Sequence, residues 1–95
     1  MLEKSIESSL GRAIQRRGGL WFKFVSPGQP GVPDRIAVLP GGRIVFVELK
    51  TLQGRLEKLQ RWQIDRLREA GADVRVVRGA AEARALVEEL FADGV

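Results

Sequence analysis

The alternation of hydrophobic and polar residues divides the chain into helical and extended segments. Over residues 3–17, the apolar side chains of Ile6, Leu10 and Ile14 recur at the spacing of one helix face. Other segments are short apolar runs separated by Gly- and Pro-rich turns, which is typical of strands. We expect further helices over about 55–70 and 80–91, strands over 20–25 and 73–77, and a pair of strands joined by a turn at 40–42.

The order of these segments predicts an α/β fold. Helix, strand, hairpin, helix, strand and helix follow one another along the chain. The strand–helix–strand unit near the end implies a right-handed crossover, which places the last strand parallel in the same sheet. We therefore expect a mixed sheet flanked by helices, in the order α-β-β-β-α-β-α. At 95 residues, the chain fits a single domain over 1–95 with a modest core.

The spacing of apolar residues also predicts which side chains are buried. Phe22 and Phe24 share one face of their strand and are expected to pack. Trp21 lies on the other face with Lys23. There it either stacks on a nucleic-acid base or, as we favour, packs in the core or an interface. The second helix is expected to bury Leu56, Leu59, Ile64 and Leu67.

Several residue types are missing, and their absence narrows the chemistry. The chain contains no His, Cys or Tyr. Ser-His-Asp and Cys-His sites, disulfide bonds, and imidazole or thiolate metal sites are therefore excluded within this chain. Acid–base chemistry must use Asp, Glu, Lys or a metal-bound water. There is no apolar stretch of about 18 residues and no signal-peptide pattern, which suits a cytoplasmic protein.

Two carboxylates and one ammonium group are predicted to meet at one corner of the sheet. Asp34 opens the first strand of the hairpin, and Glu48 and Lys50 close the second strand on one face. Because close carboxylates repel, a divalent cation between them would stabilise the arrangement. We expect Asp34, Glu48 and the backbone carbonyl of Leu49 to bind Mg²⁺ or Mn²⁺, which prefer oxygen ligands. Lys50 would orient a water molecule or stabilise charge on a phosphate.

The residues around this corner resemble a known nuclease signature. Pro33-Asp34 followed by Glu48-Leu49-Lys50 is similar to the PD-(D/E)xK pattern. The longer pattern resembles the VRR-NUC family. It consists of Gly31-Val32-Pro33-Asp34, Val47-Glu48-Leu49-Lys50-Thr51, Gly54-Arg55-Leu56, Gln60, Gly71 and Val74-Arg75-Val76-Val77-Arg78. This resemblance implies a restriction-endonuclease-like core and a metal-dependent nuclease activity.

The same resemblance adds two candidate site residues. A glutamate of the first helix commonly joins the active site in this family, which implies a catalytic and metal-binding role for Glu7. The alternative is a solvated glutamate in the first turn, where the helix dipole favours it. The family also has a glutamine on the helix after the ExK strand. Gln60 fits this position best, and Gln63 is the alternative.

The charge balance favours a polyanionic partner. The chain carries 16 Lys and Arg against 12 Asp and Glu, and the excess lies before residue 82. Most of the basic residues are Arg, whose guanidinium groups match phosphate oxygens. An Arg-rich surface reflecting only a GC-biased genome is the alternative. The residues expected to bind nucleic acid are Arg16, Arg17, Lys23, Arg35 and Arg55.

Two classes of function fit these observations. The first is a metal-dependent DNA endonuclease, and the second is a non-catalytic module that binds structured nucleic acid.

A homodimer would supply the two symmetric cuts needed to resolve a four-way junction. Trp21, Trp62 and Phe91 are also more apolar surface than we expect a small core to enclose. Stand-alone members of the resembled family look like dimeric junction-resolving enzymes. The rival is a monomeric nicking or flap nuclease that works with a partner protein.

Overall fold

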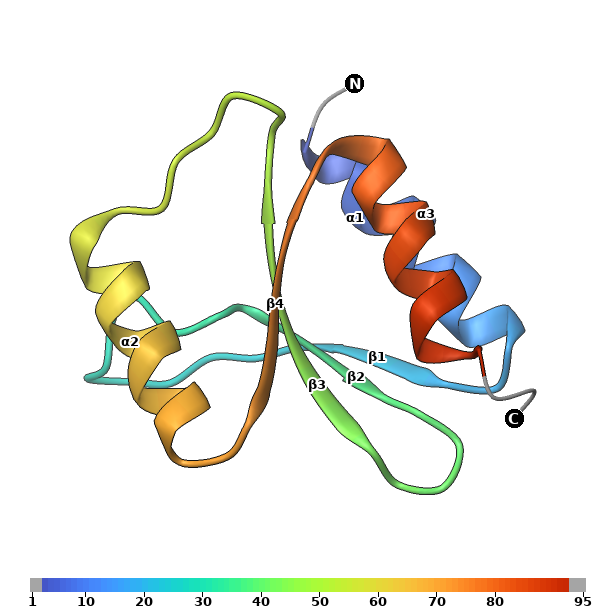
Figure 1. The fold of residues 1–95 in the computed structure, drawn as a ribbon, viewed down its shortest axis with the longest axis horizontal. Coiled ribbons are helices and arrows are strands. Elements are labelled where there is room, and N and C mark those ends of the chain that lie inside the picture. The colour runs from blue at the N-terminus through green and yellow to red at the C-terminus, as the bar shows by residue number, and fades with distance from the viewer. Residues whose placement is uncertain (1–2, 93–95) are drawn as a thin grey trace.

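A computed structural model describes residues 3–92 and contains the predicted elements in the predicted order (Figure 1). No helix within this range is long and apolar enough to cross a membrane. The helices are α1 (Glu3–Arg16), α2 (Lys58–Glu69) and α3 (Gly79–Leu90). The strands are β1 (Leu20–Lys23), β2 (Arg35–Val38), β3 (Ile44–Lys50) and β4 (Asp73–Arg78).

The strands form one mixed sheet in the order β1-β2-β3-β4. Strands β1 and β2 are antiparallel, as are β2 and β3, whereas β3 and β4 are parallel. The hairpin turn is closed by the N–H of Leu39, which donates to the carbonyl of Arg43 over 2.8 Å. Gly41 and Gly42 have φ angles of 93° and 92°, a region that favours glycine. The expected mixed α/β sheet is confirmed.

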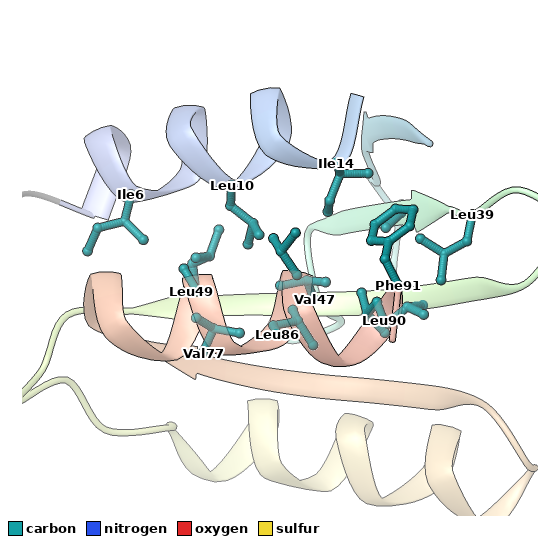
Figure 2. Packing of buried hydrophobic residues seen from close by; sticks show 14 residues of the cluster. Ile6, Leu10, Ile14, Leu39, Val47, Leu49, Val77, Leu86, Leu90 and Phe91 are labelled. Atoms are coloured by element: carbon teal, nitrogen blue, oxygen red, sulfur yellow. The ribbon is translucent and has the colours of Figure 1, made fainter. Parts of the chain in front are cut away.

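The main core lies on the face of the sheet that α1 and α3 cover together. Figure 2 shows side chains of α1 and α3 pointing toward those of the central strands, with α2 on the opposite side of the sheet. Strand β3 contributes alternate residues to this core because neighbouring side chains point to opposite faces. The cluster includes Ile6, Leu10, Ile14, Val45, Val47, Leu49, Val77, Leu86, Leu90 and Phe91.

The opposite face of the sheet is only partly covered by α2. Ile64 of α2 is buried, but Leu59 is 42% exposed, so the expectation that Leu59 is buried was wrong. Phe22 is 52% exposed, which overturns its expected packing. Phe24 does pack, edge-on against Phe46 with ring centroids 5.6 Å apart. The short helix α2 lies over the β4 side and leaves the outer face of β1 and β2 open (Figure 1).

Two of the three aromatic residues that suggested a surplus of apolar surface are enclosed. Trp21 packs against the main core, as we favoured, and Phe91 is buried in it. Trp62 remains 53% exposed, with the guanidinium of Arg66 stacked 4.4 Å from its ring centroid. Besides Trp62, the exposed apolar surface includes Leu20, Phe22 and Ile44 on the uncovered face of the sheet.

The second helix begins three residues later than its hydrophobic spacing predicts. Glu57 is the N-cap, and its backbone N–H donates to the side-chain oxygen of Gln60 over 2.9 Å. This half of a capping box fixes the first turn, so Leu56 lies outside the helix. Gly71, with a φ of 97°, follows the helix end as expected.

Strand β4 is anchored at its start by an ion-pair network around Asp73. Its carboxylate accepts hydrogen bonds from Arg75 (2.6 Å) and from Arg43 (2.7 Å), and Arg75 also pairs with Glu89. Burial by itself would raise the pKa of Asp73, but the hydrogen bonds from the two arginines hold the pKa below its ordinary value. The turn of the hairpin, β4 and α3 are thereby linked.

We expect Asp73→Asn to destabilise the protein by about 1 kcal/mol at pH 7, because it weakens charge-assisted hydrogen bonds at a partly exposed site. The folded-state pKa lies below the unfolded value of 3.8. The stabilisation is therefore present above pH 3.8 and lost as the pH falls through the folded pKa. Urea unfolding at several pH values measures this. Exposed Asp65→Asn is the control, and a penalty for Asp73→Asn that did not shrink as the pH was lowered below 3.8 would contradict the assignment.

Candidate active site

Strand β3 places Glu48 and Lys50 on the face of the sheet that looks toward α2. Val47 and Leu49, which alternate with them, are buried in the main core on the other face. The ammonium nitrogen of Lys50 lies 3.9 Å from Oε2 of Glu48. Both side chains are largely shielded, with 16% and 10% of their surfaces exposed. An acid and a base are thus held together in a partly desolvated position.

The hairpin register brings Asp34 beside this pair. Arg35 pairs with Val47, so Asp34, one residue before, lies next to Glu48, one residue after. The N–H of Phe24 donates to the carbonyl of Asp34 over 2.8 Å, which continues the ladder between β1 and β2 by one residue. The side chain of Asp34 is exposed, whereas Glu48 is buried. One carboxylate is therefore open to a ligand from solvent and its neighbour is fixed within the protein.

Gln60 is the helix residue that reaches Glu48. Its side-chain nitrogen donates to Oε2 of Glu48 over 3.3 Å, while its side-chain oxygen accepts from the N–H of Glu57. The cap of α2 and the carboxylate together fix the orientation of the amide. The structure thus brings Gln60 to Glu48. Gln60 is the glutamine that the sequence favoured over Gln63.

Gln63 instead holds the loop that leads into Asp34. It is only 4% exposed, and its side-chain nitrogen donates to Gln29 (3.3 Å) and to the carbonyl of Pro30 (3.2 Å). Gly31 lies so close to α2 that a Cβ there would be 2.9 Å from Leu59. The attachment of this loop to α2 could not be predicted from the order of residues along the chain.

Comparison with known proteins agrees with this geometry. The family model described as VRR-NUC domain matches residues 2–81. The chain belongs to the VRR-NUC domain family. A solved structure titled "VRR_NUC domain" superimposes with a TM-score of 0.85, at 31% identity, over 90% of this chain and 94% of that one. A second, titled "VRR_NUC domain protein", gives a TM-score of 0.78 at 14% identity over 97% and 89% of the two chains, and supports the fold alone.

A curated phage protein is also similar to this VRR-NUC domain. It is named "Putative nuclease p44" and comes from Acyrthosiphon pisum secondary endosymbiont phage 1. The two are 54% identical over 48 residues, which is 50% of this chain and 52% of that protein. The chain therefore spans about half the length of this curated relative.

Glu7 is not assembled with the other two carboxylates of this VRR-NUC domain. It accepts a hydrogen bond from Nε of Arg35, and the two form a partly buried ion pair. Arg35 precedes core-facing Ala37 by two residues and so shares its face of β2. Within residues 3–92, no three carboxylates are grouped closely enough to hold a metal ion. Glu7, the predicted third carboxylate, does not join Asp34 and Glu48 because it pairs with Arg35 on the face of the sheet that α1 covers.

Most of the arginines and the lysine predicted to bind nucleic acid do not gather at the site. Arg17 pairs with Glu88 over 2.8 Å and stacks on Phe91, next to α3. Lys23 is paired in register with Arg35, on the face of α1. Arg16 is exposed at the end of α1, and exposed Arg55 alone lies in the segment that follows Lys50.

Arg78 is a neighbour of the site that was not predicted from the sequence. Lys50 and Arg78 are partners in the parallel register of β3 and β4, so their side chains share one face. The Nε of Arg78 donates to the carbonyl of Gly54 over 3.1 Å, which fastens the segment after β3. Each of these basic residues ends its own strand. A parallel crossover sets the ends of β3 and β4 side by side. The positions of Lys50 and Arg78 at these two ends could therefore have predicted that Arg78 is a neighbour of the site.

The donor set fits a hard divalent cation. Asp34 and Glu48 supply carboxylate oxygens at one end of the hairpin, and the chain has no softer ligand such as His or Cys. Mg²⁺ is commonly held by one or two carboxylates together with water and substrate phosphate, so a third carboxylate is not required. The backbone carbonyl of Leu49 lies between Glu48 and Lys50 in the chain and remains a predicted ligand.

We expect Gly31→Ala to disturb the position of Asp34 more than Gly28→Ala does. Both glycines have positive φ, 91° and 78°, so both substitutions strain the backbone. Only Gly31 would also press a methyl group against Leu59, whereas nothing lies within 4 Å of the Cβ position at Gly28. In thermal unfolding, the free energy of unfolding should fall by about 1–3 kcal/mol more for Gly31→Ala than for Gly28→Ala. Equal losses for the two variants would contradict the packing of this loop on α2.

Proposed function

We propose that this VRR-NUC domain is a metal-dependent endonuclease that hydrolyses DNA phosphodiesters. The observation that carries the proposal is the convergence of Asp34, Glu48, Lys50 and Gln60 on one face of the sheet. The name of the phage relative supports nuclease activity. A binding module without catalysis would be free to lose any member of the set formed by Asp34, Glu48 and Lys50, and this chain keeps the set complete.

Each side chain has a distinct role in the proposed reaction. Bound Mg²⁺ or Mn²⁺ would supply Lewis-acid stabilisation of the phosphoryl oxygens and make water more acidic. Asp34 and Glu48 would hold the cation, and Gln60 would keep Glu48 in one orientation through its amide nitrogen. Lys50, 3.9 Å from Glu48, would orient the attacking water or stabilise the charge that develops on the phosphate.

We expect Asp34→Ala and Glu48→Ala to abolish cleavage and to weaken Mn²⁺ binding measured by calorimetry. Lys50→Ala should retain DNA binding and lose about 10²-fold or more in single-turnover rate, as the removal of a preorganised electrostatic group commonly does. Cleavage of plasmid and branched DNA with Mn²⁺, compared with EDTA, provides the measurement.

Exposed residues of α2 supply matched controls. Asp65→Ala and Lys58→Ala remove the same chemical groups from the surface and should leave the rate unchanged. Undiminished turnover by purified Asp34→Ala would refute the metal site. If Lys50→Ala weakened only DNA binding, the lysine would be a contact and the proposed catalytic role would be wrong.

We further propose that the active protein is a homodimer that selects branched DNA. The exposed sheet face supports this because its residues form two apolar rows. Leu20, Val38 and Ile44 are paired across β1, β2 and β3. Phe22, Ile36 and Phe46 form the adjacent row in the same way. Beyond the second row lie Asp34 and Glu48, so the apolar rows border the active site.

A second copy of this chain fits that face better than nucleic acid does. The six side chains of the two rows carry no charge, whereas a phosphate backbone requires cations. Leu20, Phe22 and Ile44 are 53%, 52% and 51% exposed, so they offer on the order of 300 Å² of apolar surface. Such an area suits the centre of an interface of about 800 Å² on each partner. Two sheets stacked about a two-fold axis would also hold two active sites in a fixed relation.

We expect wild-type protein to have the mass of two chains in light scattering at micromolar concentration, and Phe22→Glu to have the mass of one. Leu52→Glu is the control, because Leu52 is exposed at 75% but lies outside the two rows. A four-way junction should compete for binding better than linear duplex does. A wild-type mass of one chain, unchanged by junction DNA, would favour a monomeric nicking or flap nuclease. Equal competition by linear duplex would remove the proposed selectivity.

A further inference from the structure

An arginine-lined groove runs along the free edge of β4, between α2 and α3. Its volume is about 490 Å³, and it is bordered by Arg61 and Arg68 of α2 and by Arg75 and Arg78 of β4. Strand β4 is the last strand of the sheet, so its outer edge forms the base of the groove. Figure 1 shows β4 between α2 on one side and α3 on the other.

The groove begins one strand away from the candidate active site. Val76, which borders the groove, is the register partner of Glu48, and Arg78 is the partner of Lys50. Neighbouring strands are about 5 Å apart. Arg61 directly follows Gln60, whose side chain contacts Glu48. A ligand that leaves the site over β4 would therefore meet Arg78 and Arg61 first.

The lining of the groove is positive because its four arginines outnumber its two carboxylates, and both carboxylates have hydrogen-bond partners. Glu89 pairs with Arg75 over 2.6 Å. Glu82 accepts a hydrogen bond from the backbone N–H of Arg78 over 2.7 Å. Arg61 is exposed, and the guanidinium of Arg78 is oriented through a hydrogen bond from its Nε. Arg61 and Arg78 are thus the cations best placed for a ligand near the active site.

The edge of β4 is poorly suited to pairing with an added peptide strand. Arg68 donates from Nε (3.2 Å) and Nη2 (2.6 Å) to the carbonyl of Val74, so this backbone acceptor is already used.

Arg61 and Arg68 are two helical turns apart, about 10 Å along α2. That distance is close to the rise of about three nucleotides of a duplex strand. Repeated cations along a groove match a phosphodiester backbone.

We infer that this groove binds the phosphodiester backbone of the DNA strand flanking the cleaved bond, with Arg61 and Arg78 as the principal phosphate contacts. The inference rests on the proposed nuclease function and specifies where its substrate lies. The residues predicted from the sequence to bind nucleic acid lie outside the lining of this groove; they are Arg16, Arg17, Lys23, Arg35 and Arg55.

The test compares two double variants with the same change in net charge. Arg61→Gln/Arg78→Gln removes the inferred phosphate-binding groups. Arg12→Gln/Arg84→Gln removes two exposed arginines from α1 and α3 on the other side of the sheet. Binding of a fluorescein-labelled four-way junction is followed by anisotropy in EDTA between about 50 and 200 mM salt, so that no cleavage is needed. Circular dichroism and thermal unfolding establish that both variants are folded.

We expect the slope of log affinity against log salt to decrease in magnitude by about 0.9 for each phosphate-binding arginine that the first variant removes, and to stay near wild type in the second. The ratio of the affinity at the lowest salt concentration to that at the highest is expected to fall by about three- to four-fold for each such arginine removed. Binding by wild type with equal slopes for the two variants would overturn the groove and leave the proposed function standing. No DNA binding by wild type under these conditions would overturn the groove, whereas the proposed function is overturned only if DNA is not cleaved with Mn²⁺.

A second ligand separates DNA from an acidic protein segment. Poly-L-glutamate is titrated against the same two variants. If Arg61→Gln/Arg78→Gln abolished binding to this polymer while keeping the wild-type salt slope for DNA, the groove would be a protein-docking site and the inference would be wrong.

Discussion

The buried carboxylate of Glu48 is the constraint on which the functional face of this domain depends. A charged group removed from water must have polar partners or it becomes very costly. Here the amide of Gln60 and the ammonium group of Lys50 supply them, one from α2 and one from the same strand. Gln60 is itself fixed by the cap of α2. The start of the helix, the strand and the carboxylate therefore depend on one another.

The two faces of the sheet differ because successive side chains of β3 point to opposite faces. Val45, Val47 and Leu49 fill a core that α1 and α3 close, which makes β3 rigid. Glu48 and Lys50 stand on the other face, where α2 covers only part of the sheet. A rigid strand with one incompletely covered face is suited to holding catalytic groups in fixed positions. Glu7 lies outside this arrangement because Arg35 binds it on the core side.

The proposed surfaces lie around the site without competing for the same space. The apolar rows extend from the carboxylates across β1, β2 and β3, and the arginine groove extends from them across β4. A dimer formed through the first surface would leave the second open to DNA. The two grooves of such a dimer would be related by the two-fold axis, as the two arms of a branched substrate are.

Much of the fold and part of the site could be predicted from the sequence, because they depend on local spacing. The turn at Gly41 and Gly42 fixes the hairpin register, and that register sets Asp34 beside Glu48. Alternation within a strand places Glu48 and Lys50 on one face. The missing residue types excluded other chemistries. These inferences need only neighbours along one or two strands.

Tertiary structure decided everything that depends on which element covers which surface. Phe22 and Trp21 are both apolar neighbours in β1, and only the positions of α1 and α2 determine that Trp21 is enclosed and Phe22 exposed. Gln60 and Gln63 both face inward from α2, and the packing of the loop on α2 separates their roles. The arginine groove exists because β4 forms the sheet edge, and sequence spacing alone does not specify an edge.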